Sequence, residues 1–244
     1  MELRGRVALV TGAGRRVGRA IALGLAGRGA CVAVHYNTSA EGAHAVVEEI
    51  RAGGGRAEAF PADLTDAGAA ERLVDAVVGR LGALQLLVNS AGIMLRTPLG
   101  AVTPDLWDRI FAVNLRAPFF VAQAAAARMP DSGGAAIVNI ADLAAFEAWS
   151  GYIPHGISKA GIVQMTRALA HALAPRIRVN AVAPGAVLLP DGWDAAEGER
   201  LVATTPLRRL GAPSDVVGAV TFLLEAEYVT GETLIVDGGR HVRT

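Results

Sequence analysis

The chain has 244 residues, with 23 basic and 23 acidic side chains and a sequence pI of about 7.0. This balance offers nucleic acid or an anionic membrane surface no net electrostatic attraction, so we expect neither as a partner. No run of about 18 apolar residues predicts a membrane span, and no long apolar segment follows the N-terminus. We therefore expect a cytoplasmic protein that acts on a small molecule, and we assign no metal ligands.

Residues 1–244 form one predicted domain, because no linker, charge block or repeat divides them. Short β-rich runs alternate with longer helical patterns. Strands are expected at residues 7–10, 31–34, 57–60, 86–88, 137–140, 178–182 and 234–236, and helices at 17–25, 43–51, 69–81, 105–129, 158–173 and 214–224. Strands that are apolar on both faces and separated by helices predict a seven-stranded parallel sheet with helices on both faces. Right-handed crossovers then give a doubly wound, Rossmann-like α/β fold.

The turn that joins the first strand to the first helix is rich in glycine over residues 11–18. Backbone N–H groups and the helix dipole at such a turn attract a pyrophosphate, although a turn that merely connects two elements is the alternative. Its spacing has one more residue than the dehydrogenase fingerprint, and an arginine stands where the middle glycine would be. We assign Gly12, Arg15, Arg16, Val17 and Gly18 to the cofactor.

The end of the second strand predicts which nicotinamide cofactor binds. It carries Tyr36, Asn37, Thr38 and Ser39, without the acidic residue that hydrogen-bonds a ribose 2′-hydroxyl. Two arginines at the glycine turn and the polar groups at this strand end suit a 2′-phosphate. Solvated arginines are the alternative, but cations at a helix N-terminus are unfavourable without an anion. The sequence therefore favours NADP(H) over NAD(H).

Lys159 is the single lysine in a chain that has 23 basic side chains, the rest of them arginines. Lysine is a compact point charge that can pair, donate and titrate, whereas arginine is a planar fork that keeps its proton. A lysine retained in such a composition is a candidate for chemistry. The alternative is a surface lysine left by chance.

Seven short motifs occur in order along the chain, at residues 11–18, 63–64, 89–92, 113–115, 158–160, 178–185 and 237–239. Jointly they resemble the short-chain dehydrogenase/reductase family over essentially the whole chain, and the arginine in the glycine turn resembles its pteridine-reductase branch. The cofactor positions that the resemblance implies are Asp63 and Leu64 at the adenine, Asn89, Ala91 and Gly92 at the adenine ribose, and Pro184 and Gly185 at the nicotinamide.

The resemblance also assigns two polar residues to the reaction. Lys159 would hold the nicotinamide ribose and tune the proton donor, and Asn114 would hold a water that links Lys159 to solvent. For Asn114, an amide inside a helix that bonds to its own backbone is the alternative.

Two positions depart from the family pattern. His155 stands where the family has its proton-donating tyrosine, four residues before the lysine, and Asp142 stands where most members have a serine. Aspartate at this position agrees with the pteridine-reductase branch, but histidine does not. Neutral imidazole is a poor acid, whereas an imidazolium stabilised by Asp142 is able to supply a proton at mildly acidic pH. Tyr152 is an alternative donor, or a loop anchor.

The segment after Gly185, residues 186–208, is expected to form a lid over the substrate. Val187, Leu188 and Trp193 are its candidate substrate contacts, and Tyr152 is a further candidate outside the lid. Trp193 is suited to stack on a flat ring or to dock on its own scaffold. Substrate candidates are small molecules with a carbonyl or C=N bond, including pterin-like heterocycles.

Three classes of function remain open at this point. The first is an NADPH-dependent reductase, the second a nucleotide-binding homologue with little turnover because of His155, and the third a structural subunit of a hetero-oligomer. The helices expected at 105–129 and 158–173 are apolar on more than one face, and the resemblance places the family's dimer contact there. We therefore expect a homotetramer or a dimer.

Overall fold

The computed structural model describes residues 1–131, 134–189 and 194–242 of the chain. Seven strands form one parallel sheet in the order β3-β2-β1-β4-β5-β6-β7. The strands are β1 (Val7–Val10), β2 (Cys31–Tyr36), β3 (Arg56–Pro61), β4 (Leu86–Asn89), β5 (Ala135–Ile140), β6 (Ile177–Pro184) and β7 (Thr233–Val236). The predicted fold, a doubly wound parallel sheet, is confirmed.

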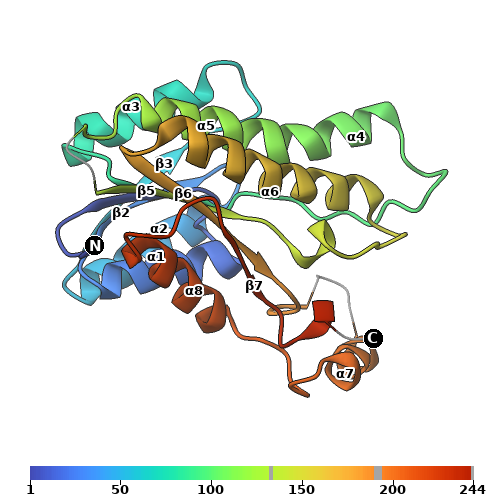
Figure 1. Cartoon of the computed structure of the whole chain (residues 1–244). Helices are drawn as coiled ribbons and strands as arrows, with labels where there is room; N and C mark the ends of the chain where they lie inside the picture. The colour runs from blue at the N-terminus through green and yellow to red at the C-terminus, as the bar shows by residue number, and fades with distance from the viewer. Residues whose placement is uncertain (132–133, 190–193, 243–244) are drawn as a thin grey trace.

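Helices cover both faces of this sheet (Figure 1). One face carries α1 (Arg16–Gly27), α2 (Ala40–Ala52) and α8 (Pro213–Glu225), and the other carries α3 (Ala69–Leu81), α5 (Ala117–Ala126) and α6 (Ile153–Leu173). Successive side chains of a strand point to opposite faces, so Val10 and Val32 enter one apolar core while Leu9 and Ala33 enter the other. Burial on both faces explains why the strands are almost entirely apolar.

The order of the strands reverses at β1, which pairs with β2 on one side and with β4 on the other. The connection after β1 runs through α1 toward β2, whereas the chain after β4 continues toward β5 in the opposite direction. Diverging connections open a crevice at the carboxyl ends of β1 and β4, which is where ligands bind in such sheets.

The long helix predicted over 105–129 is wrong as a single element. It consists of α4 (Pro104–Phe111), a π-helical segment η1 (Ala112–Arg116) and α5, which ends at Ala126. An α-helix would need the N–H of residue 118 to reach the carbonyl of Asn114, but Pro118 has no N–H. The wider π turn accommodates the proline. Thr103 caps the N-terminus of α4, since its hydroxyl accepts from the Leu106 N–H at 3.3 Å.

Two other helical boundaries differ from the prediction. α6 begins at Ile153, five residues before the expected start at Ser158, and Pro154 suits its first turn because the missing N–H has no helical partner there. The predicted lid over 186–208 contains a helix, α7 (Ala195–Thr204), that begins with a capping box between Asp194 and Glu197. Among the helices that the structure describes, none is long and apolar enough to cross a membrane.

Candidate active site

The glycine turn after β1 packs closely against its surroundings. Gly12 has a φ of 65°, a conformation that favours glycine, and a Cβ on Gly18 would lie 2.2 Å from the Gly12 carbonyl oxygen. The Thr11 hydroxyl accepts from the N–H groups of Ser90 and Ala91, at 3.0 and 3.1 Å. This threonine therefore ties the turn after β1 to the turn after β4 across the crevice.

Arg16 occupies a backbone position that suits glycine, with a φ of 51°. Left-handed backbone costs about 1–2 kcal/mol for a residue with a Cβ. The side chain reaches away from the turn, and its Nη2 donates to the Leu189 carbonyl at 2.9 Å, at the start of the predicted lid. Arg15 and Arg16 are both exposed at the N-terminus of α1. Strained backbone of this kind is concentrated at functional sites, so the conformation of Arg16 supports a functional role for this residue.

His35 contacts the glycine turn from β2, and no motif or spacing in the sequence singled it out. Its Nδ1 lies 3.1 Å from the Gly12 nitrogen and its Nε2 lies 3.1 Å from the Ala62 carbonyl oxygen. Burial lowers the pKa of His35 to about 4, against opposing effects of the Ala62 carbonyl and Asp63. Because the folded pKa lies below the ordinary value of about 6.5, neutral His35 stabilises the fold above that pH, and this contribution is lost as the pH falls toward 4.

The residues expected at the 2′-phosphate follow the end of β2, and those expected at the adenine follow the end of β3. Asn37 and Thr38 are exposed, while Tyr36, Ser39 and Leu64 are half-buried. All of them lie at the same sheet edge as the glycine turn, as the two predictions require.

Asp63 is exposed and its carboxylate is held by its own loop. Asp63 Oδ1 accepts from the backbone N–H and the hydroxyl of Thr65, at 2.9 and 2.7 Å. These bonds to Thr65 hold the pKa of Asp63 below its ordinary value. The carboxylate is therefore charged at neutral pH and fixed in direction.

Asn89 points its side chain into the protein rather than toward the crevice. Its Nδ2 donates to the Pro118 carbonyl at 3.2 Å and to Asn139 Oδ1 at 3.0 Å. Gly92, in the loop after β4, lies close to two other residues of the site. A Cβ on Gly92 would lie 3.4 Å from Asn114 Oδ1 and 3.7 Å from Lys159 Nζ.

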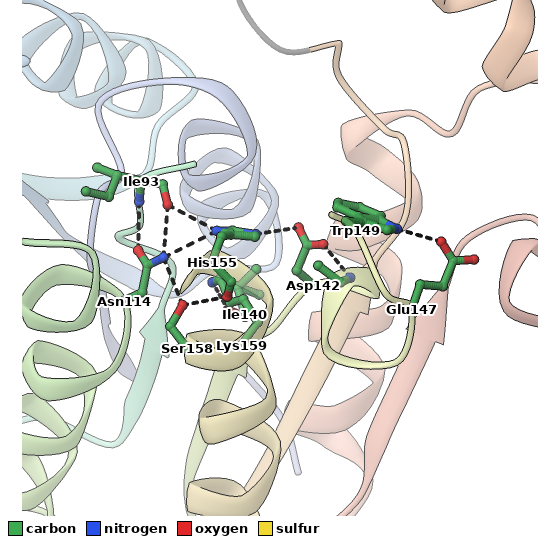
Figure 2. Close-up of polar contacts among 10 residues, drawn as sticks. Ile93, Asn114, Ile140, Asp142, Glu147, Trp149, His155, Ser158 and Lys159 are labelled. Carbon is green, nitrogen blue, oxygen red and sulfur yellow. Dashed lines mark hydrogen bonds and ion pairs between the residues drawn. The ribbon is translucent and has the colours of Figure 1, made fainter. Parts of the chain in front are cut away.

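Asn114 is buried in the π-helical segment and holds the backbone of Ile93 (Figure 2). Its Oδ1 accepts from the Ile93 N–H at 2.8 Å, and its Nδ2 donates to the Ile93 carbonyl at 2.9 Å and to Ser158 Oγ at 3.2 Å. The alternative that this amide bonds to its own helix is wrong. One lone pair of Oδ1 remains for the water that the family resemblance implies.

His155 lies in the first turn of α6, between Asn114 and Asp142 (Figure 2). Its Nδ1 lies 3.2 Å from the Ile93 carbonyl oxygen and 3.3 Å from Asn114 Nδ2. Because both amide hydrogens of Asn114 are directed to other acceptors, we assign the Nδ1 hydrogen to a bond with the Ile93 carbonyl. Nε2 then faces Asp142 Oδ2 at 3.6 Å, buried and without a hydrogen-bond partner among the described residues.

Asp142 and Lys159 place opposite charges on either side of His155. Asp142 Oδ1 accepts from the Ala144 N–H at 2.8 Å, which leaves Oδ2 toward the imidazole. Lys159 is 7% exposed and its Nζ donates to the Ile140 carbonyl at 2.8 Å, so a surface lysine is the wrong interpretation. Burial lowers the pKa of Lys159, and the Asp142 carboxylate opposes this shift.

The substrate side of the site is partly described. Val187 is buried and Leu188 is exposed, whereas the predicted contact Trp193 lies outside the described residues. The sequence interpretation missed Trp149, whose Nε1 donates to Glu147 Oε2 at 2.8 Å and whose ring meets that of Tyr152 edge to face at 6.3 Å. The sequence signal that could have identified Trp149 is its position, seven residues after Asp142.

The described residues fit a nicotinamide cofactor. The edge combines a glycine turn at a helix N-terminus with Gly92, which lies beside Asn114 and Lys159, and with Gly185, where a Cβ would lie 2.8 Å from Asp237 Cβ. Backbone without side chains is what a ligand lying flat along the strand ends requires. No group of three or more acidic, histidine or cysteine side chains among the described residues could hold a metal ion.

A family model described as enoyl-(acyl carrier protein) reductase matches residues 12–241. The 3-oxoacyl-(acyl-carrier-protein) reductase FabG of Staphylococcus aureus is 38% identical over 240 residues, covering 96% of this chain and 98% of its own. The FolM alternative dihydrofolate reductase 1 of Brucella canis, complexed with NADP, superposes with a TM-score of 0.94 at 35% identity, covering 100% of this chain and 96% of that one.

A variant of a short-chain dehydrogenase/reductase from Serratia marcescens superposes with a TM-score of 0.92 at 36% identity, covering 99% of this chain and 100% of that one. The predicted cofactor, NADP(H), is confirmed at the level of the family, because relatives of the same fold hold it. From the matched model, these full-length similarities and the site geometry, the chain belongs to the short-chain dehydrogenase/reductase family, and it is an oxidoreductase.

Proposed function

We propose that this protein is an NADPH-dependent reductase that transfers hydride to a carbonyl or C=N bond of a small molecule, including pterin-like heterocycles. The observation that carries the proposal is the buried arrangement of Asn114, Asp142, His155 and Lys159 at the carboxyl edge of the sheet. The names of FabG and FolM, an oxoacyl reductase and a dihydrofolate reductase, support these two bond types.

The bound cofactor supplies the hydride, and the residues of this chain position it and provide the proton. Lys159, whose Nζ lies beside Gly92, is placed to bind ribose hydroxyls. The stretch that includes Gly185 offers bare backbone to the nicotinamide. Arg15 and Arg16 bring positive charge to the N-terminus of α1, an end of a helix where anions bind favourably. A nucleotide with a 2′-phosphate carries more negative charge than one without it, so these arginines favour NADPH over NADH.

His155 acts as the proton donor in this proposal. Its Nδ1–H is held by the Ile93 carbonyl, so the proton that leaves is the one on Nε2. As hydride reaches the substrate carbon, the imidazolium gives this proton to the substrate oxygen or nitrogen and becomes neutral imidazole. Asp142, 3.6 Å from Nε2, stabilises the imidazolium before the transfer. The Trp149 ring, which packs edge to face on Tyr152, offers a flat surface for a planar substrate.

The cofactor preference predicts at least about tenfold tighter binding of NADPH than of NADH, equivalent to about 1.4 kcal/mol. Arg16→Gly should reduce this ratio several-fold and raise the thermal midpoint, because glycine relieves the left-handed backbone at residue 16. Nicotinamide fluorescence titration and thermal unfolding measure the two effects. Arg19→Ala, which removes an ion pair with Glu49 one turn along α1, is the control and should leave the ratio unchanged. Equal affinity of the wild type for both nucleotides would contradict the proposal.

Lys159→Arg should lower turnover by at least about tenfold, about 1.4 kcal/mol, while the protein remains folded. Arginine keeps the charge but not the compact shape that a buried ammonium between Ile140 and Gly92 requires. Arg167→Lys, at an exposed position of the same helix, is the matched control and should retain wild-type turnover. Unchanged turnover and NADPH affinity in the Lys159→Arg enzyme would remove this lysine from the mechanism.

If imidazolium is the acid, reduction of a ketone should decrease as the pH rises through its ionisation. Asp142→Asn should move this decrease to lower pH, because the anion that stabilises the positive imidazolium is lost. His155→Tyr should restore the family's donor and raise ketone reduction, most clearly above pH 7. The three enzymes are compared in pH profiles on one ketone and on one cyclic imine, whose protonated form depends much less on the enzyme's acid.

Two results would change the assignment. A flat ketone profile that Asp142→Asn leaves unmoved would exclude His155 as the acid. Turnover that appears on any substrate only after His155→Tyr would favour the second function, a nucleotide-binding homologue with little activity of its own. The observation that favours this second function is the 3.6 Å separation of His155 Nε2 from Asp142 Oδ2, which is longer than a hydrogen bond.

We also propose that the protein assembles as a homotetramer or a dimer through α5 and α6. An apolar groove lies between these helices, lined mainly by Phe111, Leu115, Phe119, Phe120, Met165 and Leu169. Phe120→Asp should yield a smaller species in light scattering at micromolar concentration, because a charge in a buried apolar contact is unfavourable. Leu99→Asp, at an 85% exposed leucine outside the groove, should leave the mass unchanged. A monomeric wild type would contradict the proposal.

A further inference from the structure

The imidazole of His35 connects two loops that contact different parts of the expected cofactor. Its Nδ1 accepts from the Gly12 N–H in the glycine turn, and its Nε2 donates to the Ala62 carbonyl in the loop after β3, both at 3.1 Å. The side chain is 2% exposed. Asp63 and Leu64, expected at the adenine, follow Ala62 directly.

Only one form of the imidazole makes both bonds. The Gly12 N–H can only donate and the Ala62 carbonyl can only accept, so Nδ1 must carry a lone pair and Nε2 a hydrogen. That form is the neutral ring. Burial keeps the ring neutral by lowering its pKa to about 4, although the Asp63 carboxylate acts in the opposite direction.

The glycine turn is also held by contacts other than those of the His35 ring. The Ala13 N–H donates to the His35 carbonyl at 2.8 Å, so one residue of β2 holds two successive N–H groups of the turn. On the other side, a Cβ on Gly12 would lie 2.8 Å from Ala91 Cα. The turn is therefore set between β2 and the loop after β4, and the His35 ring determines its distance from the loop after β3.

We propose that His35 is a positioning residue for the cofactor, which holds the glycine turn and the β3–α3 loop at the separation that NADP(H) requires. This inference rests on the proposed cofactor. Because His35 is bonded to Gly12 and Ala62 rather than placed among Asp142, His155 and Lys159, it acts on the affinity for NADPH and the KM for NADPH. The value of kcat at saturating cofactor should change little.

Three substitutions separate the two bonds. His35→Asn places an amide oxygen near the position of Nδ1 and keeps an acceptor for Gly12, whereas His35→Gln reaches toward Ala62 with a donor. His35→Phe keeps a ring of similar size and removes both bonds. A net hydrogen bond contributes modestly and an unpaired buried polar group costs more, so we expect about a tenfold or greater rise in the NADPH Kd for Phe. The Asn and Gln variants each keep one bond and lose the other, so each should show a smaller rise in Kd, of about threefold.

Asn180→Leu is the matched control. Asn180 is 1% exposed and also connects two backbone segments, because its Nδ2 donates to the Val229 carbonyl at 2.8 Å and its Oδ1 accepts from the Glu232 N–H at 3.1 Å. Its contacts lie away from the glycine turn. Removing this connection should lower the thermal midpoint as His35→Phe does, while the NADPH Kd stays near that of the wild type.

NADPH fluorescence titrations, thermal unfolding and steady-state kinetics at saturating NADPH are measured for the five proteins. A rise in Kd that is largest in His35→Phe and smaller in Asn and Gln, with an unchanged kcat, supports the positioning role. An unchanged Kd in His35→Phe, or an equal rise in Asn180→Leu, would overturn it. If Phe fails to fold, a rise in Kd in both Asn and Gln supports the role, and a Kd equal to that of the wild type in both overturns it. A wild type that binds no NADPH would instead overturn the proposed cofactor, and this inference with it.

Discussion

The arrangement of the reacting groups depends on the paired hydrogen bonds between the Asn114 amide and the backbone of Ile93. These bonds fix the Ile93 carbonyl, and that carbonyl determines which nitrogen of His155 carries the structural hydrogen. Nε2 is then left to face Asp142. A change in the amide would release the Ile93 backbone and the direction of the imidazole together, which is why three residues from three separate elements behave as one unit.

The π-helical segment places the amide where it is needed. Pro118 removes the N–H that an α-helix would direct to the Asn114 carbonyl, so the helix widens at this residue. Asn114 is fully buried there and contacts the loop after β4 and the first turns of α6. A backbone irregularity of this kind is frequent at functional sites, and here its cause is one proline in the sequence.

The fold could be predicted from the sequence because the central strands are apolar on both faces, and a parallel sheet between two helical layers is the arrangement that buries both faces. The break at Pro118 and the capping box of Asp194 and Glu197 follow from local rules, but the sequence interpretation missed both. Two further features do not follow from local rules. The bonds of His35 and the inward direction of Asn89 depend on which segments lie next to β2 and β4 in space.

Residues that contradict local preferences gather at one edge of the sheet. Arg16 takes a backbone conformation suited to glycine, Lys159 is buried, and His155 keeps Nε2 in the interior without a hydrogen bond to the described residues. Each costs folding free energy, and such conflicts are expected at functional sites rather than scattered through a stable core. Arg15 and Arg16 also place positive charge at the positive end of the α1 dipole. A bound dinucleotide phosphate offsets that repulsion, so cofactor binding stabilises the native state through the same edge that costs it free energy.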